Sequence, residues 1–120
     1  MGEAMPAINL SYRVPQEKVS EIESIINEHA EFMKKTYVDN DEAVPPTHTY
    51  FTKAAELVNP TDPEQGLTGY TIFTINEIWN SPDDVMAHIN RAMEAPHFER
   101  FKSAMQYAHV APMGEITFKL

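Results

Sequence analysis

Two histidines in this sequence have the residue type and spacing for acid-base chemistry. His29 falls on the apolar stripe of a predicted helix over residues 16–35, and His88 falls on that of a second predicted helix. A neutral imidazole on such a face can act as a general base, because its pKa lies near neutrality. If both helices cover one sheet, the two rings meet in one cavity, with His88 as the candidate base and His29 as a pocket residue. The alternative is that each ring only lines the pocket wall, held by a backbone carbonyl or a tyrosine.

Glu77 and Trp79 are further candidates for this pocket. Glu77 and the two histidines could form the two-histidine, one-carboxylate triad that binds iron. However, no two histidines are spaced i, i+4, and neither H-x-x-E-H nor H-E-x-x-H occurs, so we expect no metal. We expect Glu77 to pair with Arg91 or Arg100 instead. Trp79 is expected in the core, where its indole N–H needs a partner.

The seven methionines supply flexible thioethers, which suit an adaptable pocket. Four of them lie on or near predicted apolar helix faces, namely Met33, Met86, Met93 and Met105. We assign Met86 to the pocket, and the alternative is ordinary gap filling in a small core. His48 and His109 fall on predicted strands without a motif around them, and we assign them no role.

The segment before the first helix predicts a strand over residues 6–14. Its even-numbered residues from Ile8 to Val14 are apolar and fall on one face, while the residues between them are polar. Pro15 ends this strand and suits the first turn of the helix over 16–35, in which apolar residues recur at spacings of three and four. An acidic, proline-containing stretch over 38–47 then predicts an exposed connection.

Two strands follow, over residues 48–58 and 68–79, because both stretches are rich in threonine and aromatic residues. Between them NPTDPEQGL predicts a longer hairpin loop, so the two strands should pair antiparallel. The second of these strands is apolar on both faces. One face carries Tyr70, Ile72 and Ile78, and the other carries Phe73, Ile75 and Trp79.

The sequence Ser81-Pro82-Asp83-Asp84 predicts the start of the second helix, with serine as N-cap, proline at the first position and acids in the first turn. This helix should end before Pro96, since a proline disfavours helical geometry at the residue before it. A short helical piece over 97–106 follows. The final strand lies within 109–120 and is interrupted by Pro112 and Gly114.

The predicted order β-α-β-β-α-β is that of a ferredoxin-like α+β domain over residues 1–120, with a four-stranded antiparallel sheet and two helices on one face. The helices leave the other face of the sheet uncovered, although strand 68–79 is apolar on both. We expect a second copy to cover it, sheet against sheet, in a homodimeric α+β barrel. The alternative is an ordinary surface, because apolar atoms are common there.

Charge and composition exclude several classes of function. The 120 residues contain 9 Lys and Arg against 18 Asp and Glu, and a net charge of -9 repels nucleic acids and anionic membranes. The absence of cysteine excludes disulfides, thiolate metal sites and iron–sulfur clusters. No apolar run approaches the roughly 20 residues of a membrane span, and the first residues lack the features of a signal peptide. We expect a cytoplasmic protein without nucleic-acid or membrane partners.

Three motifs stand close together in the sequence. They are Glu77-Ile78-Trp79-Asn80-Ser81, then Asp84 and His88 in the second helix, then the PHFERF stretch over 96–101. This pattern resembles the E-x-W-x-S motif, the helix histidine and the H-F-x-x-F turn of the antibiotic biosynthesis monooxygenase superfamily. The resemblance covers about residues 68–105 and implies a dimeric α+β barrel with a pocket. The superfamily includes cofactor-free oxygenases of quinols and polyketides as well as haem-degrading enzymes.

The resemblance also implies site residues. The haem-degrading members use an asparagine on the first strand, for which Asn9 stands here as a pocket residue. They also use a tryptophan and a haem-ligating histidine, where this sequence has His88 and Lys102. Polyketide oxygenases place an asparagine four residues before the strand tryptophan, where this sequence has Ile75. We therefore expect no cofactor, and haem binding is kept as an alternative.

The function expected from these observations is binding of a small apolar or aromatic molecule by a homodimer. Its expected activity is cofactor-independent monooxygenation of a quinol-like compound, with His88 as the base. The alternative is a non-catalytic ligand-binding or stress-type dimer.

Overall fold

The computed structural model describes residues 5–40 and 43–120. Residues 1–4, at which we expected no signal peptide, and residues 41–42 of the expected 38–47 connection lie outside the described residues. The strands are β1 (Pro6–Val14), β2 (His48–Leu57), β3 (Leu67–Ile78) and β4 (Ala108–Glu115). The helices are α1 (Val19–Tyr37), α2 (Pro82–Glu94) and α3 (Phe98–Ala104), with short 3₁₀ turns at Gln16–Lys18, Pro63–Gln65 and Met105–Tyr107.

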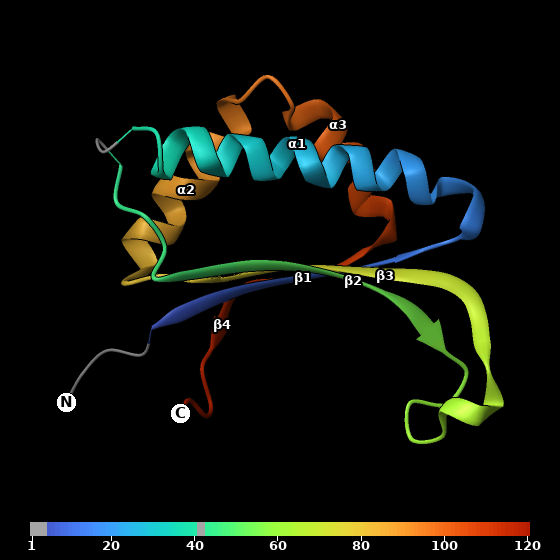
Figure 1. The fold of residues 1–120 in the computed structure, drawn as a ribbon. Coiled ribbons are helices and arrows are strands. Elements are labelled where there is room, and N and C mark those ends of the chain that lie inside the picture. Colours follow the sequence, from blue (N-terminus) through green and yellow to red (C-terminus); the bar gives the residue numbers. More distant parts are fainter. Residues whose placement is uncertain (1–4, 41–42) are drawn as a thin grey trace.

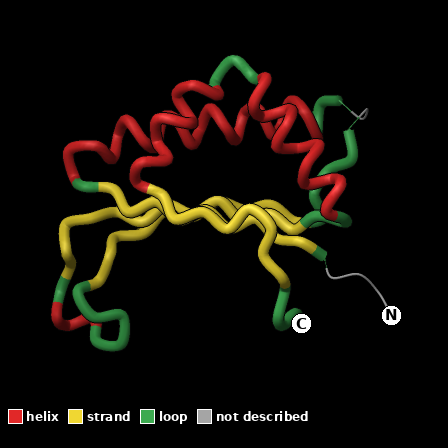
Figure 2. Tube along the Cα trace, turned by 180° about the vertical axis from the view of Figure 1, so that it is seen from behind, coloured by secondary structure: helices red, strands yellow, loops and turns green. Residues whose placement is uncertain are grey.

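The described strands form one antiparallel sheet in the order β2-β3-β1-β4. β2 and β3 pair antiparallel, as predicted, with Phe51 opposite Ile75. β1 lies in the middle of the sheet, where Leu10 is opposite Ile75 on one side and Val110 on the other. The helices α1, α2 and α3 all lie on one side of this sheet (Figure 1). The reverse view in Figure 2 shows the chain's C-terminus on the opposite side.

The face of the sheet beneath the helices holds the core. Alternation along β1 buries the even-numbered residues from Ile8 to Val14, as predicted. The register places Glu77 of β3 opposite Ile8, so this carboxylate faces the helices together with Phe73 and Ile75. The other face of β3 carries Tyr70, Ile72 and Ile78, all half-buried, as the alternation predicted.

The helices begin and end close to their predicted limits. α1 starts at Val19 after a 3₁₀ turn and continues to Tyr37, two residues past the predicted end. Its sheet-facing side is buried at Ile22, Ile26, His29 and Met33, as the stripe predicted, and also at Ile25. At the start of α2 the Ser81 hydroxyl accepts a hydrogen bond of 3.2 Å from the Asp84 N–H, which confirms the predicted N-cap.

The last strand is shorter than the sequence predicted. β4 ends at Glu115, which is opposite Pro6, the first residue of β1. Among the residues that the structure describes, those beyond Glu115 therefore have no neighbouring strand to pair with. As a result Phe118 and Leu120, expected within the strand, are 76% and 106% exposed. Within the described ranges, none of the helices combines the length and the apolar character needed to cross a bilayer.

Candidate functional site

A cavity of about 270 Å³ lies between the sheet and the helices. Most of its wall is apolar, formed by Ile8, Leu10, Ile75, Ile89, Ala92, Met93, Phe98, Phe101, Met105, Val110 and Pro112. The exceptions are the exposed Lys102 and a buried cluster of His29, Glu77 and His88. We call these three residues the His-Glu-His cluster. An apolar cavity with a few convergent polar groups is typical of small-molecule sites.

Glu77 is the carboxylate of this cluster, and its side chain is only 1% exposed. Trp79 lies two residues further along the chain, on the same face, and its Nε1–H donates a hydrogen bond of 3.0 Å to Glu77 Oε1. Burial raises the pKa of Glu77 to about 7, although the hydrogen bond from Trp79 acts in the opposite direction. The carboxyl group therefore changes charge near neutral pH.

The ion pair that we expected for Glu77 does not form. Arg91 instead donates a hydrogen bond of 3.1 Å to the Tyr37 hydroxyl, and Arg100 pairs with Glu28 on the helix surface. In the part of the chain that the structure describes, the basic side chain in contact with Glu77 is His88, whose Nε2 lies 3.5 Å from Oε1. The prediction of a pair with Arg91 or Arg100 is wrong because both arginines find partners outside the cavity wall.

His88 enters the cluster from α2, one helical turn past the buried Val85. Its Nδ1 lies 2.6 Å from the Tyr37 hydroxyl, while its ring packs 4.6 Å from the Trp79 ring, centroid to centroid. Burial, followed by the charge of Arg91, lowers the pKa of His88 to about 4. The ring is therefore neutral at pH 7, and a tyrosine holds it, as one of the two sequence alternatives proposed.

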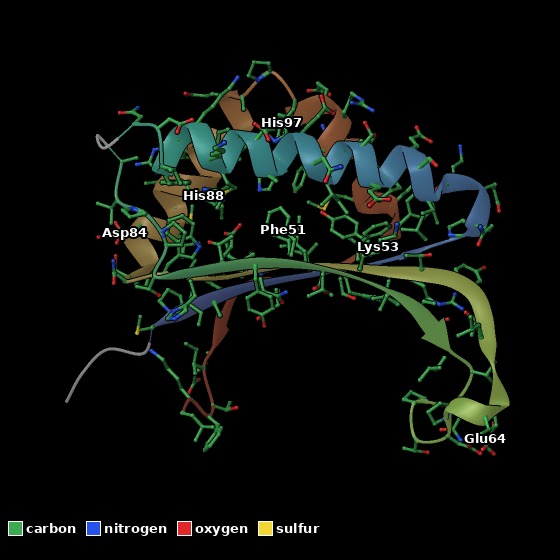
Figure 3. All side chains as sticks on the ribbon, in the orientation of Figure 1. Phe51, Lys53, Glu64, Asp84, His88 and His97 are labelled. Carbon is green, nitrogen blue, oxygen red and sulfur yellow. The ribbon has the colours of Figure 1, made fainter. Side chains whose placement is uncertain are left out.

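His29 enters the same cluster from α1. Its Nδ1 lies 3.0 Å from Nε2 of His97, and its ring stacks on Phe101 with 4.4 Å between ring centroids. On the sheet side, Phe51 of β2 stacks below it at 6.3 Å; Figure 3 shows Phe51 pointing from the sheet toward the helix layer. Burial and the neighbouring imidazoles of His88 and His97 lower the pKa of His29 to about 3, so this ring is also neutral.

The His-Glu-His cluster places three titratable side chains close together in an otherwise apolar cavity wall. One nitrogen or oxygen of each residue lies within 4.8 Å of the others. Because the pKa of Glu77 is near neutrality and that of His88 is about 4, the carboxylate is the better matched proton acceptor at pH 7. This differs from the sequence interpretation, in which His88 was the candidate base.

Three residues that we expected in the pocket do not line the cavity. Asn9 has odd parity in β1, so its side chain is on the opposite face of the sheet, where it donates to Asn76. Met86 is 46% exposed on the outer side of α2 and does not line the cavity. Trp79 is fully buried and contacts the cluster through its hydrogen bond to Glu77, but it does not line the cavity.

Two residues of the site were not identified from the sequence. Tyr37 lies two residues past the predicted end of the first helix, and His97 appeared only within the H-F-x-x-F motif. Tyr37 contacts Nδ1 of His88, which lies 51 residues away in the sequence. His97 contacts Nδ1 of His29, which lies 68 residues away. Spacing alone does not bring such distant residues together, since these contacts depend on how α1 crosses the sheet. Comparisons with protein-family models, with curated proteins and with solved structures find no match.

Proposed function

We propose that the protein binds a small aromatic compound carrying an acidic hydroxyl group and removes the proton of that hydroxyl. The observation that supports this proposal is the position of the His-Glu-His cluster in a wall that is otherwise apolar. The apolar body of such a ligand would contact residues such as Phe101 and Ile89. Its hydroxyl would face Glu77, whose pKa of about 7 suits proton uptake.

The size of the cavity favours a ligand of one or two rings. Its volume of about 270 Å³ is just below the ~300–1,000 Å³ of typical ligand pockets. An engineered apolar cavity of ~150 Å³ binds benzene, so this cavity has room for a fused two-ring quinol. Met93 and Met105 line it and can adapt to the shape of the ligand.

Cofactor-independent monooxygenation is the reaction that we propose for this ligand. Proton transfer to Glu77 leaves an electron-rich anion, which gives one electron to O₂. The two radicals combine to a peroxide anion, which takes the proton back from Glu77 to give a hydroperoxide at a ring carbon that carries a hydrogen. Loss of water then leaves a carbonyl at that carbon. One oxygen atom enters the product and the other leaves as water, so the substrate itself supplies the electrons. His88 would stabilise the charge on Glu77 through its Nε2.

The test measures oxygen consumption with 1,4-naphthohydroquinone and a series of substituted phenols and quinols. We expect Glu77→Gln to lower the rate by at least about 100-fold, the lower limit for removing a general base. The exposed Glu99 of α3 provides a matched control, and Glu99→Gln should leave the rate unchanged. Binding without oxygen consumption would favour the non-catalytic alternative. Absence of both binding and consumption across the series would refute the proposal.

We also propose the ferredoxin-like arrangement and a homodimer that packs the uncovered sheet faces together. The strand order and the layering on one side of the sheet support this arrangement. The uncovered face holds half-buried Ile72 and Ile78 of β3 beside Tyr50 of β2, which is 60% exposed. The β2–β3 hairpin and the C-terminal segment both bend toward this side, as Figure 1 shows, and so frame the surface that a second copy would occupy.

Light scattering coupled to size-exclusion chromatography tests the dimer. We expect a mass of twice 13.6 kDa for the native chain. Thr74→Arg, at the centre of the uncovered face opposite Ser11 and Thr52, should shift the mass to that of one chain. Asn90→Arg, on the exposed side of α2, should remain dimeric. A native protein that runs as a monomer at all concentrations would refute the homodimer.

A further inference from the structure

We propose that His29, Glu77 and His88 bind one divalent first-row transition-metal ion, with its open coordination positions directed into the cavity. The inference goes beyond the proposed function, which concerns the metal-free cluster, because a Glu77 carboxylate that binds an ion no longer takes up the proton of the substrate. One donor atom of each residue lies within 4.8 Å of the other two, and all three residues line the cavity. Two imidazoles and one carboxylate are the donors that catalytic zinc and non-haem iron sites use.

The three donor atoms need to move only slightly closer together to bind one ion. Donor atoms at about 2.0–2.1 Å from a tetrahedral ion lie roughly 3.3 Å apart. Nε2 of His88 and Oε1 of Glu77 are already 3.5 Å apart. The widest pair, at most 4.8 Å apart, must approach by about 1.5 Å, which is within the range of side-chain rotation. The three residues come from α1, β3 and α2, so the ion would connect both helices to the sheet.

Each proposed ligand already has a partner that fixes its orientation. Nδ1 of His88 is held by the Tyr37 hydroxyl, and Nδ1 of His29 is held by His97 Nε2. These contacts leave the Nε2 atom of each ring for the ion. The carboxyl group of Glu77 is held by the hydrogen bond that it accepts from the Trp79 Nε1–H. Metal-binding histidines in proteins are almost always oriented by such a contact at the other ring nitrogen, so the arrangement is more than a chance meeting of three polar groups.

The charges of the cluster also suit a cation. Both histidine rings are buried, and burial favours the neutral form of an imidazole, which is the form that binds metal. Glu77 is a buried carboxylate without a lysine or arginine partner among residues 5–40 and 43–120. An ion of charge +2 would replace its proton and leave a net charge of +1. That charge favours an anionic oxygen donor, such as a phenolate or enolate, at the open position.

Titration of tag-free, EDTA-treated protein with Co²⁺ tests the site through visible d–d absorption. We expect one Co²⁺ per chain, because one donor atom from each of the three residues lies close to the other two. His29→Gln and His88→Gln should each weaken binding more than the roughly 10–100-fold caused by Tyr37→Phe, which removes only an outer partner. The exposed His48 is the matched control, and His48→Gln should bind like the native chain. Far-UV circular dichroism verifies that each variant is folded.

Two results would overturn the inference. One is the absence of d–d absorption with folded native protein, and the other is equal Co²⁺ affinity in His29→Gln, His88→Gln and His48→Gln. The proposed function is tested separately by 1,4-naphthohydroquinone binding in EDTA. Binding of the hydroquinone without Co²⁺ binding refutes the metal site alone, and Co²⁺ binding without the hydroquinone refutes the proposed function alone.

Discussion

Replacing Glu77 by glutamine should change how the stability of the protein depends on pH. Burial raises the pKa of this carboxyl group from its ordinary 4.5 to about 7 in the folded chain. Below pH 4.5 the group is protonated in both the folded and the unfolded chain, so it contributes no pH dependence. Between pH 4.5 and 7 the unfolded chain releases the proton first, and the free energy of unfolding therefore falls as the pH rises.

The magnitude follows from the two pKa values. At 1.36 kcal/mol per pH unit, the rise from 4.5 to about 7 corresponds to about 3 kcal/mol of lost stability above pH 7. Between pH 5 and pH 8 the same linkage gives about 2.5 kcal/mol. His29 and His88 act in the opposite direction, since their lowered pKa values make the folded chain lose stability as the pH falls below 6.5.

The comparison of Glu77→Gln with the native chain cancels the histidine contribution, because both proteins keep His29 and His88. The native chain loses this stability as the pH rises, whereas the variant does not. We therefore expect the free energy of unfolding of the variant minus that of the native chain to be about 2.5 kcal/mol larger at pH 8 than at pH 5. Urea unfolding followed by far-UV circular dichroism, in EDTA and at fixed protein concentration, measures it. A relative stability that is the same at both pH values would refute a carboxyl held protonated by burial.

Other expected results concern the core, the helix cap and the surface. Tyr12→Phe should stabilise the fold by about 1 kcal/mol in urea, because the buried Tyr12 hydroxyl has no hydrogen-bond partner among the described residues; a loss of stability would contradict this. Phe101→Ala should cost about 3–5 kcal/mol of unfolding free energy and weaken naphthohydroquinone binding, since Phe101 is buried and lines the cavity. Ser81→Ala should cost about 1 kcal/mol through loss of the α2 N-cap, and an unchanged urea midpoint would argue against the cap. Arg100→Ala should cost less than about 1 kcal/mol, because its ion pair with Glu28 is about half exposed.

Local signals in the sequence predicted the elements well, because each has a local physical cause. Alternation identified β1, and Ser81 with Pro82 identified the start of α2 within one residue. The ends of elements were less accurate where a neighbour decides them. The final strand stops at Glu115 because β1 begins at Pro6, and no property of residues 116–120 indicates that limit.

The candidate site was predicted only in part. His29, Glu77 and His88 were recognised from their apolar neighbours, and the triad was considered from residue type alone. The i, i+4 spacing argument against it applies to sites built on one helix, whereas this cluster draws on two helices and a strand. Asn9 was assigned by resemblance although strand parity directs its side chain to the other face. Parity within β1 was available from the sequence and would have corrected that assignment.

The hydrogen bond from Trp79 to Glu77 has an optical consequence. Trp79 is the single tryptophan of the chain, it is fully buried, and its indole nitrogen lies 3.0 Å from the carboxylate. The emission of an indole depends on the charges around it, and here the ring also lies 4.6 Å from His88, centroid to centroid. The intrinsic fluorescence of the protein is therefore a built-in reporter of the cluster, which records proton uptake, an arriving ion or a bound ligand without any label.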